Sequence, residues 1–233
     1  MDDNIAGRAF TLYLCRHGES MTNIDGLPEN SPLARYPPLS QRGERQAELL
    51  GGRFGDVPLS AVFSSGFERA AATAHSIIKK QPAGGCEKIF ILPDLSECGE
   101  LGDESSLEGL CERHPAVPAP DVTIPPLFPD TNRDGAWQYE RAQGVFSYFA
   151  EHYSNGEYIA AVTHAGFLNY LVMAALGLHP QDKRYKMNFY NTGVTKIIFY
   201  VGGVSADGAR CKIDYLNDAW HLRAENCPYL RGS

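Results

Sequence analysis

Short apolar runs that favour β-strands alternate along this chain with segments of helical spacing. Glycine, proline and polar residues separate them, as is typical of strands and helices in an ordered domain. The runs expected to be strands are 10–15, 59–63, 88–92, 158–162, 194–201 and 211–216. The segments expected to be helices are 40–54, 67–79, 137–153 and 165–176. This alternation predicts an α/β domain with a mostly parallel central sheet of about six strands.

The chain length fits one domain. Its 233 residues, of which 43% are hydrophobic, are enough for a single large core. Residues 93–135 differ from the rest because they are rich in proline and have no clear apolar period. We expect one domain over 1–233, with an irregular, lid-like insertion at about 93–135 and a loop-like tail over 217–233.

Charge and cysteine content narrow the possible partners and location. The net charge of -7 and the pI near 5.5 argue against a broad surface for nucleic acid or for an anionic membrane. A small anionic substrate remains possible, since a few buried arginines can make a positive pocket. The six cysteines form no C-x-x-C pair, and no signal peptide or membrane span is visible. We expect a cytoplasmic protein with free thiols and no membrane partner; its oligomeric state is not readable.

The first segment with chemical potential is Arg16-His17-Gly18, directly after the first predicted strand. A histidine nucleophile needs a neutral ring with one nitrogen facing the phosphorus, and a neighbouring cation keeps the ring neutral. Arg16 supplies that cation and a fork of donors for phosphate oxygens. Gly18 is expected to let the backbone pass close to a ligand. Taken alone, the segment is equally well explained as an ordinary strand end.

Two further strand ends carry related residues. Ser64-Ser65 leads into a helix with Arg69 in its first turn, a place that favours anions. His164 follows the run 158–162 and could give a phosphoryl oxygen a proton or a hydrogen bond, helped by the next N–H groups, that of Ala165 first. A solvated arginine and a packed core histidine are the simpler alternatives. Ligands of parallel sheets bind beyond the carboxyl ends of the strands, so we expect His17 and His164 to share one site.

Together these segments resemble the histidine phosphatase superfamily, the phosphoglycerate-mutase-like proteins. The chain matches the family patterns R-H-G-E-[ST]-x-x-N, P-L-[ST]-x-x-G-x-x-Q-A, S-S-x-x-x-R-A-x-x-T-A and V-x-H-x-G. A late N-T-G-V-T run also looks like the family's last core strand. These matches lie at 16–23, 38–47, 64–74, 162–166 and 191–195. The resemblance covers most of 10–80 and 138–200, but not the proline-rich insertion.

The resemblance implies a three-layer α/β/α sandwich and a phosphomonoester hydrolase. His17 would carry the phosphoryl group, and water would then attack the phosphohistidine. The phosphoryl oxygens would be held by Arg16, Asn23, Arg69 and His164. No metal or other cofactor is expected, and the chain lacks H-x-x-x-H and H-x-H spacings.

The proton donor is less well specified. The family usually places it in a pattern like L-x-E-x-x-x-G after the third strand, which puts Glu97 in the expected position. Here the glycine comes one residue late and the usual tryptophan after it is missing. We expect Glu97 to be the proton donor, with Asp94 and Glu100 as alternatives and a solvated loop charge as the alternative interpretation of Glu97.

Two other functions compete with a phosphatase. A phosphoglycerate mutase would carry N-x-x-x-G-W-x-D after the first motif and a basic insertion, whereas residues 93–135 hold only two arginines. A catalytically weak module that binds phosphorylated ligands would have lost the nucleophile or an arginine, and all are present. We expect a small phosphorylated substrate, with specificity set by residues 24–38 and 93–135.

Overall fold

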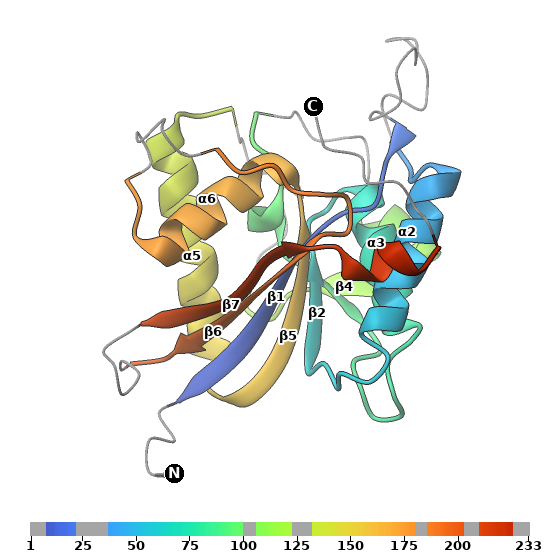
Figure 1. Ribbon diagram of the computed structural model, residues 1–233, viewed down its shortest axis with the longest axis horizontal. Coiled ribbons are helices and arrows are strands. Elements are labelled where there is room, and N and C mark those ends of the chain that lie inside the picture. The colour runs from blue at the N-terminus through green and yellow to red at the C-terminus, as the bar shows by residue number, and fades with distance from the viewer. Residues whose placement is uncertain are drawn as a thin grey trace.

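A mixed seven-stranded sheet forms the centre of the domain (Figure 1). The computed structural model describes residues 8–21, 37–99, 106–122, 132–179, 186–202 and 210–225. The strands are β1 (Ala9–Arg16), β2 (Ala61–Ser64), β3 (Ile89–Ile91), β4 (Ala116–Pro118), β5 (Asn155–Thr163), β6 (Val194–Tyr200) and β7 (Cys211–Asp218). The helices are α2 (Gln41–Arg53), α3 (Glu68–Ile78), α4 (Leu107–Arg113), α5 (Gly135–His152) and α6 (Ala165–Leu176), with 3-10 helices η2 (Pro93–Leu95) and η3 (Trp220–Glu225). All the predicted strands and helices are present.

The strand order is β4-β3-β2-β5-β1-β6-β7. The strands from β4 to β1 pair in parallel, while β6 runs antiparallel to β1 and β7 antiparallel to β6. The prediction of a mostly parallel sheet is therefore confirmed.

Two apolar clusters, one on each face of the sheet, explain the three layers. In β1, Leu12 and Leu14 belong to a cluster with Phe149 of α5 and residues of α6. Tyr13, between them, belongs to the opposite cluster with Leu50 of α2 and residues of α3. Each fully buried leucine contributes about 1.5–3 kcal/mol through the hydrophobic effect. Helices α5 and α6 thus cover one face and α2 and α3 the other, as Figure 1 shows, which confirms the predicted sandwich.

The register of the central strands fixes where the site lies. β1 and β5 pair in parallel with Arg16 opposite Thr163, so the next residue of each strand is a histidine. On the other side of β5, Ser64 at the end of β2 lies opposite Val162. The carboxyl ends of three adjacent strands therefore meet at one edge of the sheet.

The expectation of irregular structure is wrong in two places. Within 93–135, the described residues form η2, α4 and the edge strand β4, which pairs with β3. Ser106 caps α4 by accepting a 3.0 Å hydrogen bond from the Gly109 N–H, which stabilises this seven-residue helix. In the tail, residues 220–225 form η3 rather than a loop. The expectation of a lid stays a prediction, and residues 100–105 and 123–131 lie outside the described residues.

The described cysteines agree with the expectation of free thiols. Free thiols are found at all the described cysteines, Cys15, Cys86, Cys98, Cys111 and Cys211. Burial raises the pKa of the Cys15 thiol to about 12, so this residue is a protonated part of the core. Among the residues that the structure describes, no helix is long and apolar enough to cross a membrane.

Candidate active site

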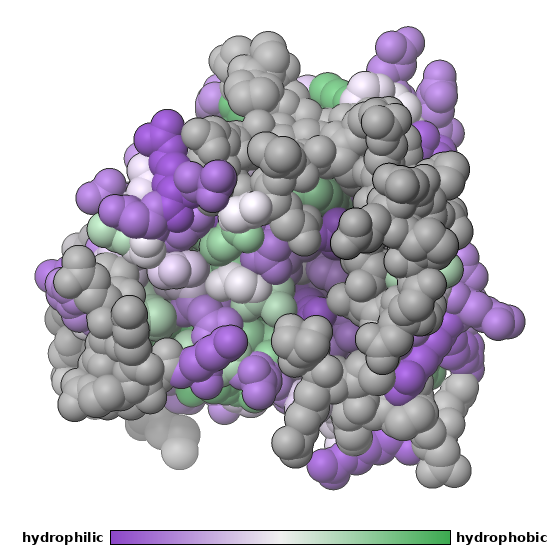
Figure 2. All heavy atoms as spheres, turned by 90° about the horizontal axis from the view of Figure 1, so that it is seen from above, coloured by the Kyte–Doolittle hydropathy of each residue, from purple (hydrophilic) through white to green (hydrophobic). Residues whose placement is uncertain are grey.

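His17 and His164 lie together at the carboxyl edge of the sheet. Their ring centroids are 5.0 Å apart and their planes are inclined by 57°. His17 is 4% exposed and His164 is fully buried. The expectation that two strand-end histidines meet is therefore confirmed. Seen from above in Figure 2, the molecule is hollowed near the centre of this end.

The ring of His17 is fixed in one orientation. Its Nδ1 lies 2.6 Å from the carbonyl oxygen of Gly18, and because a carbonyl only accepts, Nδ1 must carry the proton. The lone pair is then on Nε2. Burial lowers the pKa of His17 well below its usual range, and the charges of Arg69 and Arg16 lower it further. The ring is therefore neutral at physiological pH.

The backbone around His17 is held by several elements. Its N–H donates to the Thr163 carbonyl at 3.0 Å, and its carbonyl accepts from the Asn191 side chain at 3.1 Å. The next N–H, that of Gly18, donates to Oγ1 of Thr73 at 3.0 Å. The position of the imidazole is thus set by β5, by α3 and by the turn before β6.

Gly18 packs closely against the start of helix α2. A Cβ atom at Gly18 would lie 2.6 Å from the carbonyl oxygen of Gly43, and one at Gly43 would collide with the backbone of Glu19. Ser40 donates to the Glu19 carboxylate at 2.6 Å and caps α2. The two glycines therefore let the loop after β1 pack directly on α2.

Arg16 and Arg69 place two guanidinium groups beside the histidines. Both side chains are 4% exposed. Arg16 donates through Nη1 to the carbonyl of Phe189 at 2.8 Å, while its buried Nε has no hydrogen-bond partner among the described residues. Arg69, in the first turn of α3, lies over the ring of Phe67 at 4.5 Å. A buried guanidinium with a spare donor is suited to bind an anion.

Both ring nitrogens of His164 have protein partners. Arg69 can only donate, so its Nη2, 3.2 Å away, requires Nδ1 of His164 to be an acceptor. Nε2 then carries the proton and donates to Oγ of Ser65 at 2.8 Å. Burial, followed by the charge of Arg69, lowers the pKa of His164 well below its usual range. In this arrangement, a neutral His164 orients Arg69.

Glu97 lies at the start of α6. Its Oε1 accepts from the N–H of Phe167 at 2.9 Å and from that of Cys98 at 2.8 Å, and its Oε2 accepts from Gly166 at 3.0 Å. A Cβ atom at Gly166 would lie 2.4 Å from Oε1, so glycine leaves the space that the carboxylate fills. The charge of Glu97 also opposes the lowering of the Arg16 pKa by burial. Glu97 therefore belongs to the same cluster.

The remaining predicted residues have different outcomes. Asp94 is an exposed residue of η2, and Nη1 of Arg141 donates to its carbonyl oxygen at 3.1 Å. Asn23 and Glu100 lie outside the described residues. Ala165 is the first residue of α6, between His164 and Gly166. Of the described candidates for proton donor, Glu97 is the one whose carboxylate contacts the start of α6 beside His164.

Several supporting residues were given no role by sequence reasoning. Thr73, Ser65 and Gln46 lie inside the matched motifs, and Gln46 accepts from the N–H of Glu19 at 2.8 Å. Their positions inside the matched motifs were the sequence feature that could have identified them. Arg141 lies in no motif; its only signal is a charged residue on the apolar side of α5, whose buried positions include Ala142 and Val145.

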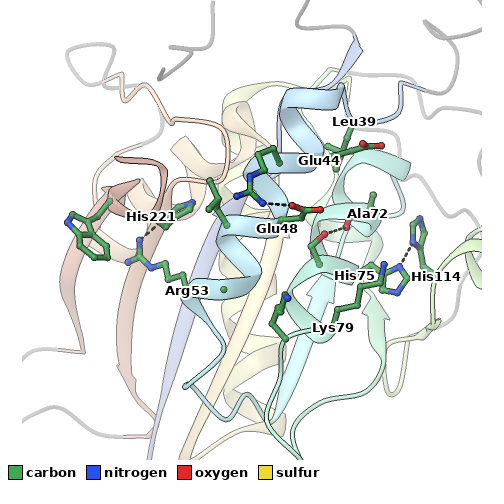
Figure 3. A pocket seen from close by; sticks show the side chains of 15 residues that line it. Leu39, Glu44, Glu48, Arg53, Ala72, His75, Lys79, His114 and His221 are labelled. Carbon is green, nitrogen blue, oxygen red and sulfur yellow. Dashed lines mark hydrogen bonds and ion pairs between the residues drawn. The ribbon is translucent and has the colours of Figure 1, made fainter. Parts of the chain in front are cut away.

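A second hollow lies away from this cluster. It is a groove of about 1120 Å³ along the outer side of α2 and α3 (Figure 3). In it, Nδ1 of His75 lies 3.0 Å from Nδ1 of His114, whose Nε2 lies 2.8 Å from Glu68. None of the predicted site residues lines this groove.

Among solved structures, the fold is similar to phosphoserine phosphatase from Entamoeba histolytica and to phosphoglycerate mutase from Bacillus anthracis. The first has a TM-score of 0.61 at 19% identity and covers 91% of this chain and 99% of that one. The second has a TM-score of 0.62 at 18% identity and covers 94% and 97%. At these identities the likeness establishes the fold.

Curated relatives match a shorter part of the chain. A probable fructose-2,6-bisphosphatase TIGAR A from Danio rerio is 34% identical over 88 residues, which are 38% of this chain and 33% of the relative. Adenosylcobalamin/alpha-ribazole phosphatase from Escherichia coli (strain K12) is 35% identical over 86 residues, 37% and 39% of the two chains. The matched region thus spans about a third of the length of these relatives.

The model of one protein family matches residues 12–211, which include both histidines, both arginines and Glu97. On this match, over most of its length, the chain belongs to the histidine phosphatase superfamily (branch 1).

Proposed function

We propose that this chain hydrolyses phosphate monoesters through a phosphohistidine formed on Nε2 of His17. The observation that carries the proposal is the orientation of the ring. Nδ1 donates to the Gly18 carbonyl, so the neutral imidazole keeps its lone pair on Nε2. Arg16 and Arg69 lie close enough to lower the pKa of that ring, and they supply the charge that a phosphoryl group requires.

The substrate phosphate would bind between the two guanidinium groups. The spare Nε donor of Arg16 favours an anion there. Arg69 is oriented by His164, so its fork is pre-arranged. By resemblance, Asn23, His164 and the N–H of Ala165 would bind the remaining phosphoryl oxygens. A donor contact from His164 requires a proton on the nitrogen that faces the anion.

In the first step, Nε2 of His17 attacks the phosphorus and the bond from phosphorus to the ester oxygen breaks. That oxygen leaves with the bonding pair and takes a proton from the carboxyl group of Glu97. In the second step, water attacks the phosphorus and gives a proton to the Glu97 carboxylate, while the bond from phosphorus to Nε2 breaks and its electron pair returns to the His17 ring. Inorganic phosphate leaves, and His17 and Glu97 return to their starting forms.

The substrate class is a small phosphorylated compound. Relatives named for fructose 2,6-bisphosphate and for alpha-ribazole phosphate, and a similar fold solved with phosphoserine, support that class. We propose that the reaction needs no metal, since histidine attack and arginine binding supply the nucleophile and the charge.

The experiment is a hydrolysis screen over phosphorylated metabolites and p-nitrophenyl phosphate, with the His17→Ala protein as the background and with EDTA in a parallel series. Phosphate release that requires His17 and persists in EDTA is expected. Interconversion of 3-phosphoglycerate and 2-phosphoglycerate without net phosphate release would point to a mutase. Binding of phosphate without turnover would point to a ligand-binding module.

A further inference from the structure

Arg141 of α5 is a buried cation outside every matched motif. Only 7% of it is exposed, and its guanidinium lies over the rings of Phe167 at 3.7 Å and Trp137 at 5.4 Å. Its Nε has no hydrogen-bond partner among the described residues. Such a buried charge is costly, and well-packed apolar replacements of buried ionic groups are often no less stable. Stability is therefore a weak explanation for an arginine at this position.

The contacts of Arg141 converge on the backbone that leads to Glu97. Its Nη1 donates to the carbonyl oxygens of Asp94 at 3.1 Å and Ser96 at 2.9 Å. Its Nη2 donates to the side chain of Gln138 at 2.7 Å, which fixes the plane of the fork. The rigid planar group thus sets the spacing between two carbonyls immediately before Glu97.

The carbonyl between them is held from the opposite side. Oγ1 of Thr163 donates to the Leu95 carbonyl at 2.6 Å, and Thr163 directly precedes His164. The carbonyl groups of residues 94, 95 and 96 are therefore all bound by side chains of α5 and β5. This places the residue before Glu97 in a fixed relation to the strand that carries His164.

Phe167 joins Arg141 to the carboxylate itself. Its ring lies under the guanidinium, while its N–H donates to Oε1 of Glu97. A displacement of the Arg141 side chain would act on Glu97 through both the loop and the start of α6.

We propose that Arg141 is a positioning residue that holds the carboxyl group of Glu97 where the leaving oxygen departs. This inference rests on the proposed function of Glu97 as proton donor. Arg141 acts through Glu97 and is not itself expected to touch the substrate.

The test is a double-mutant cycle with two aryl esters. Wild type, Arg141→Met, Glu97→Gln and the double variant are compared by kcat/KM on phenyl phosphate and on p-nitrophenyl phosphate. Phenolate is the stronger base and depends more on protonation as it leaves. Arg141→Met should lower kcat/KM on phenyl phosphate by about 10- to 100-fold, and on p-nitrophenyl phosphate by less than about threefold. In the Glu97→Gln background, the same change should cost less than about threefold on either ester.

Arg45→Met is the matched control, since it removes an arginine that pairs with Glu48 on the surface of α2. It should stay within about twofold of wild type. An equal loss from Arg141→Met in both backgrounds, or an equal loss on both esters, would overturn the proposal. Failure of the proposed function has a different signature: wild-type kcat/KM in Glu97→Gln.

Arg141→Lys covers the case in which Arg141→Met does not fold. Lysine keeps the charge and can reach one carbonyl, but it lacks the fork. It should retain thermal stability and lose about three- to tenfold in kcat/KM on phenyl phosphate alone. Unchanged kinetics, or the same loss on both esters, would again overturn the role of Arg141.

Discussion

The two sides of the candidate site are built in different ways. We call the proposed phosphate-binding residues the phosphate side, and the proposed proton donor with its loop the acid side. The phosphate side consists of Arg16, His17, Arg69 and His164, which are at most 4% exposed and lie at strand ends or in the first turn of a helix. The acid side is Glu97 with residues 93–98, a 3-10 helix and the loop after it, where Glu97 is only half-buried. Sheet register positions the first group, whereas the second depends on separate side-chain contacts. Substitutions on the phosphate side should therefore cause large losses of activity. Changes on the acid side should instead reduce activity according to how far they displace Glu97.

The largest effect is expected from the nucleophile. His17→Ala should reduce kcat/KM by at least about 10³-fold on both phenyl and p-nitrophenyl phosphate, since no other group accepts the phosphoryl. It should also abolish acid-labile phosphate labelling of the denatured protein. An unchanged melting temperature serves as the control for folding. Label retained by this variant would refute His17 as the nucleophile.

A smaller and selective loss is expected on the acid side. Glu97→Gln keeps the acceptor oxygen but cannot supply a proton, so kcat/KM on phenyl phosphate should fall by roughly 10²-fold. On p-nitrophenyl phosphate the loss should be several-fold smaller, because the leaving group is a weaker base. Pre-steady-state release of nitrophenol should then outpace release of phosphate, since the second step also needs a base. Equal losses on the two esters would remove the distinction between the two sides.

Gly166→Ala offers a third comparison because it changes Glu97 without mutating it. The new methyl group would displace the carboxylate from the start of α6. We expect about a tenfold loss of kcat/KM on phenyl phosphate. The melting temperature should change little, since the displaced atoms end a flexible side chain.

Gly144→Ala is its matched control. This glycine is exposed in α5, with no atom near a new Cβ, so alanine should raise stability by about 0.5–1 kcal/mol and leave activity unchanged. Wild-type activity in Gly166→Ala would show that the position of the Glu97 carboxylate in the structure is not the one used in the reaction.

Sequence reasoning brought His17 and His164 to the same edge of the sheet because their placement depends on local features. Each of Arg16, His17 and His164 follows an apolar run by one or two residues. Because the two runs pair in parallel, these residues come to the same edge of the sheet. The Ser40 cap of α2 was likewise readable from its neighbours. Where a feature depends on residues close in sequence, pattern and motif were sufficient.

The acid side and its supports depend on contacts distant in sequence. Arg141 lies 45 positions from Ser96, and Gly166 lies 69 from Glu97, so no window of the sequence contains both partners. β4 was missed because three residues ending in Pro118 give too short a pattern. Gly18 was noticed, but its close contact with α2 was not foreseeable from its own segment.

The smallest expected effect concerns stability and again separates the two sides. The neutral histidines of the phosphate side have lowered pKa values in the folded state, so the unfolded chain binds more protons below its own histidine pKa. The free energy of unfolding should therefore fall as the pH drops. His221 in η3 is a buried histidine outside the candidate site that shows the same effect, because burial and then the charge of Arg53 lower its pKa from 6.5 to about 4.

Each such histidine should cost about 1 kcal/mol between pH 6.5 and pH 5.5. Urea unfolding of wild type, His17→Asn and His221→Asn at several pH values measures this directly. Each variant should flatten the slope of unfolding free energy against pH by about one proton, and Gly166→Ala should leave the slope unchanged because it alters only the acid side. A wild-type slope in His17→Asn would mean that folding does not lower the pKa of this ring, contrary to the effect expected from its burial beside Arg69 and Arg16.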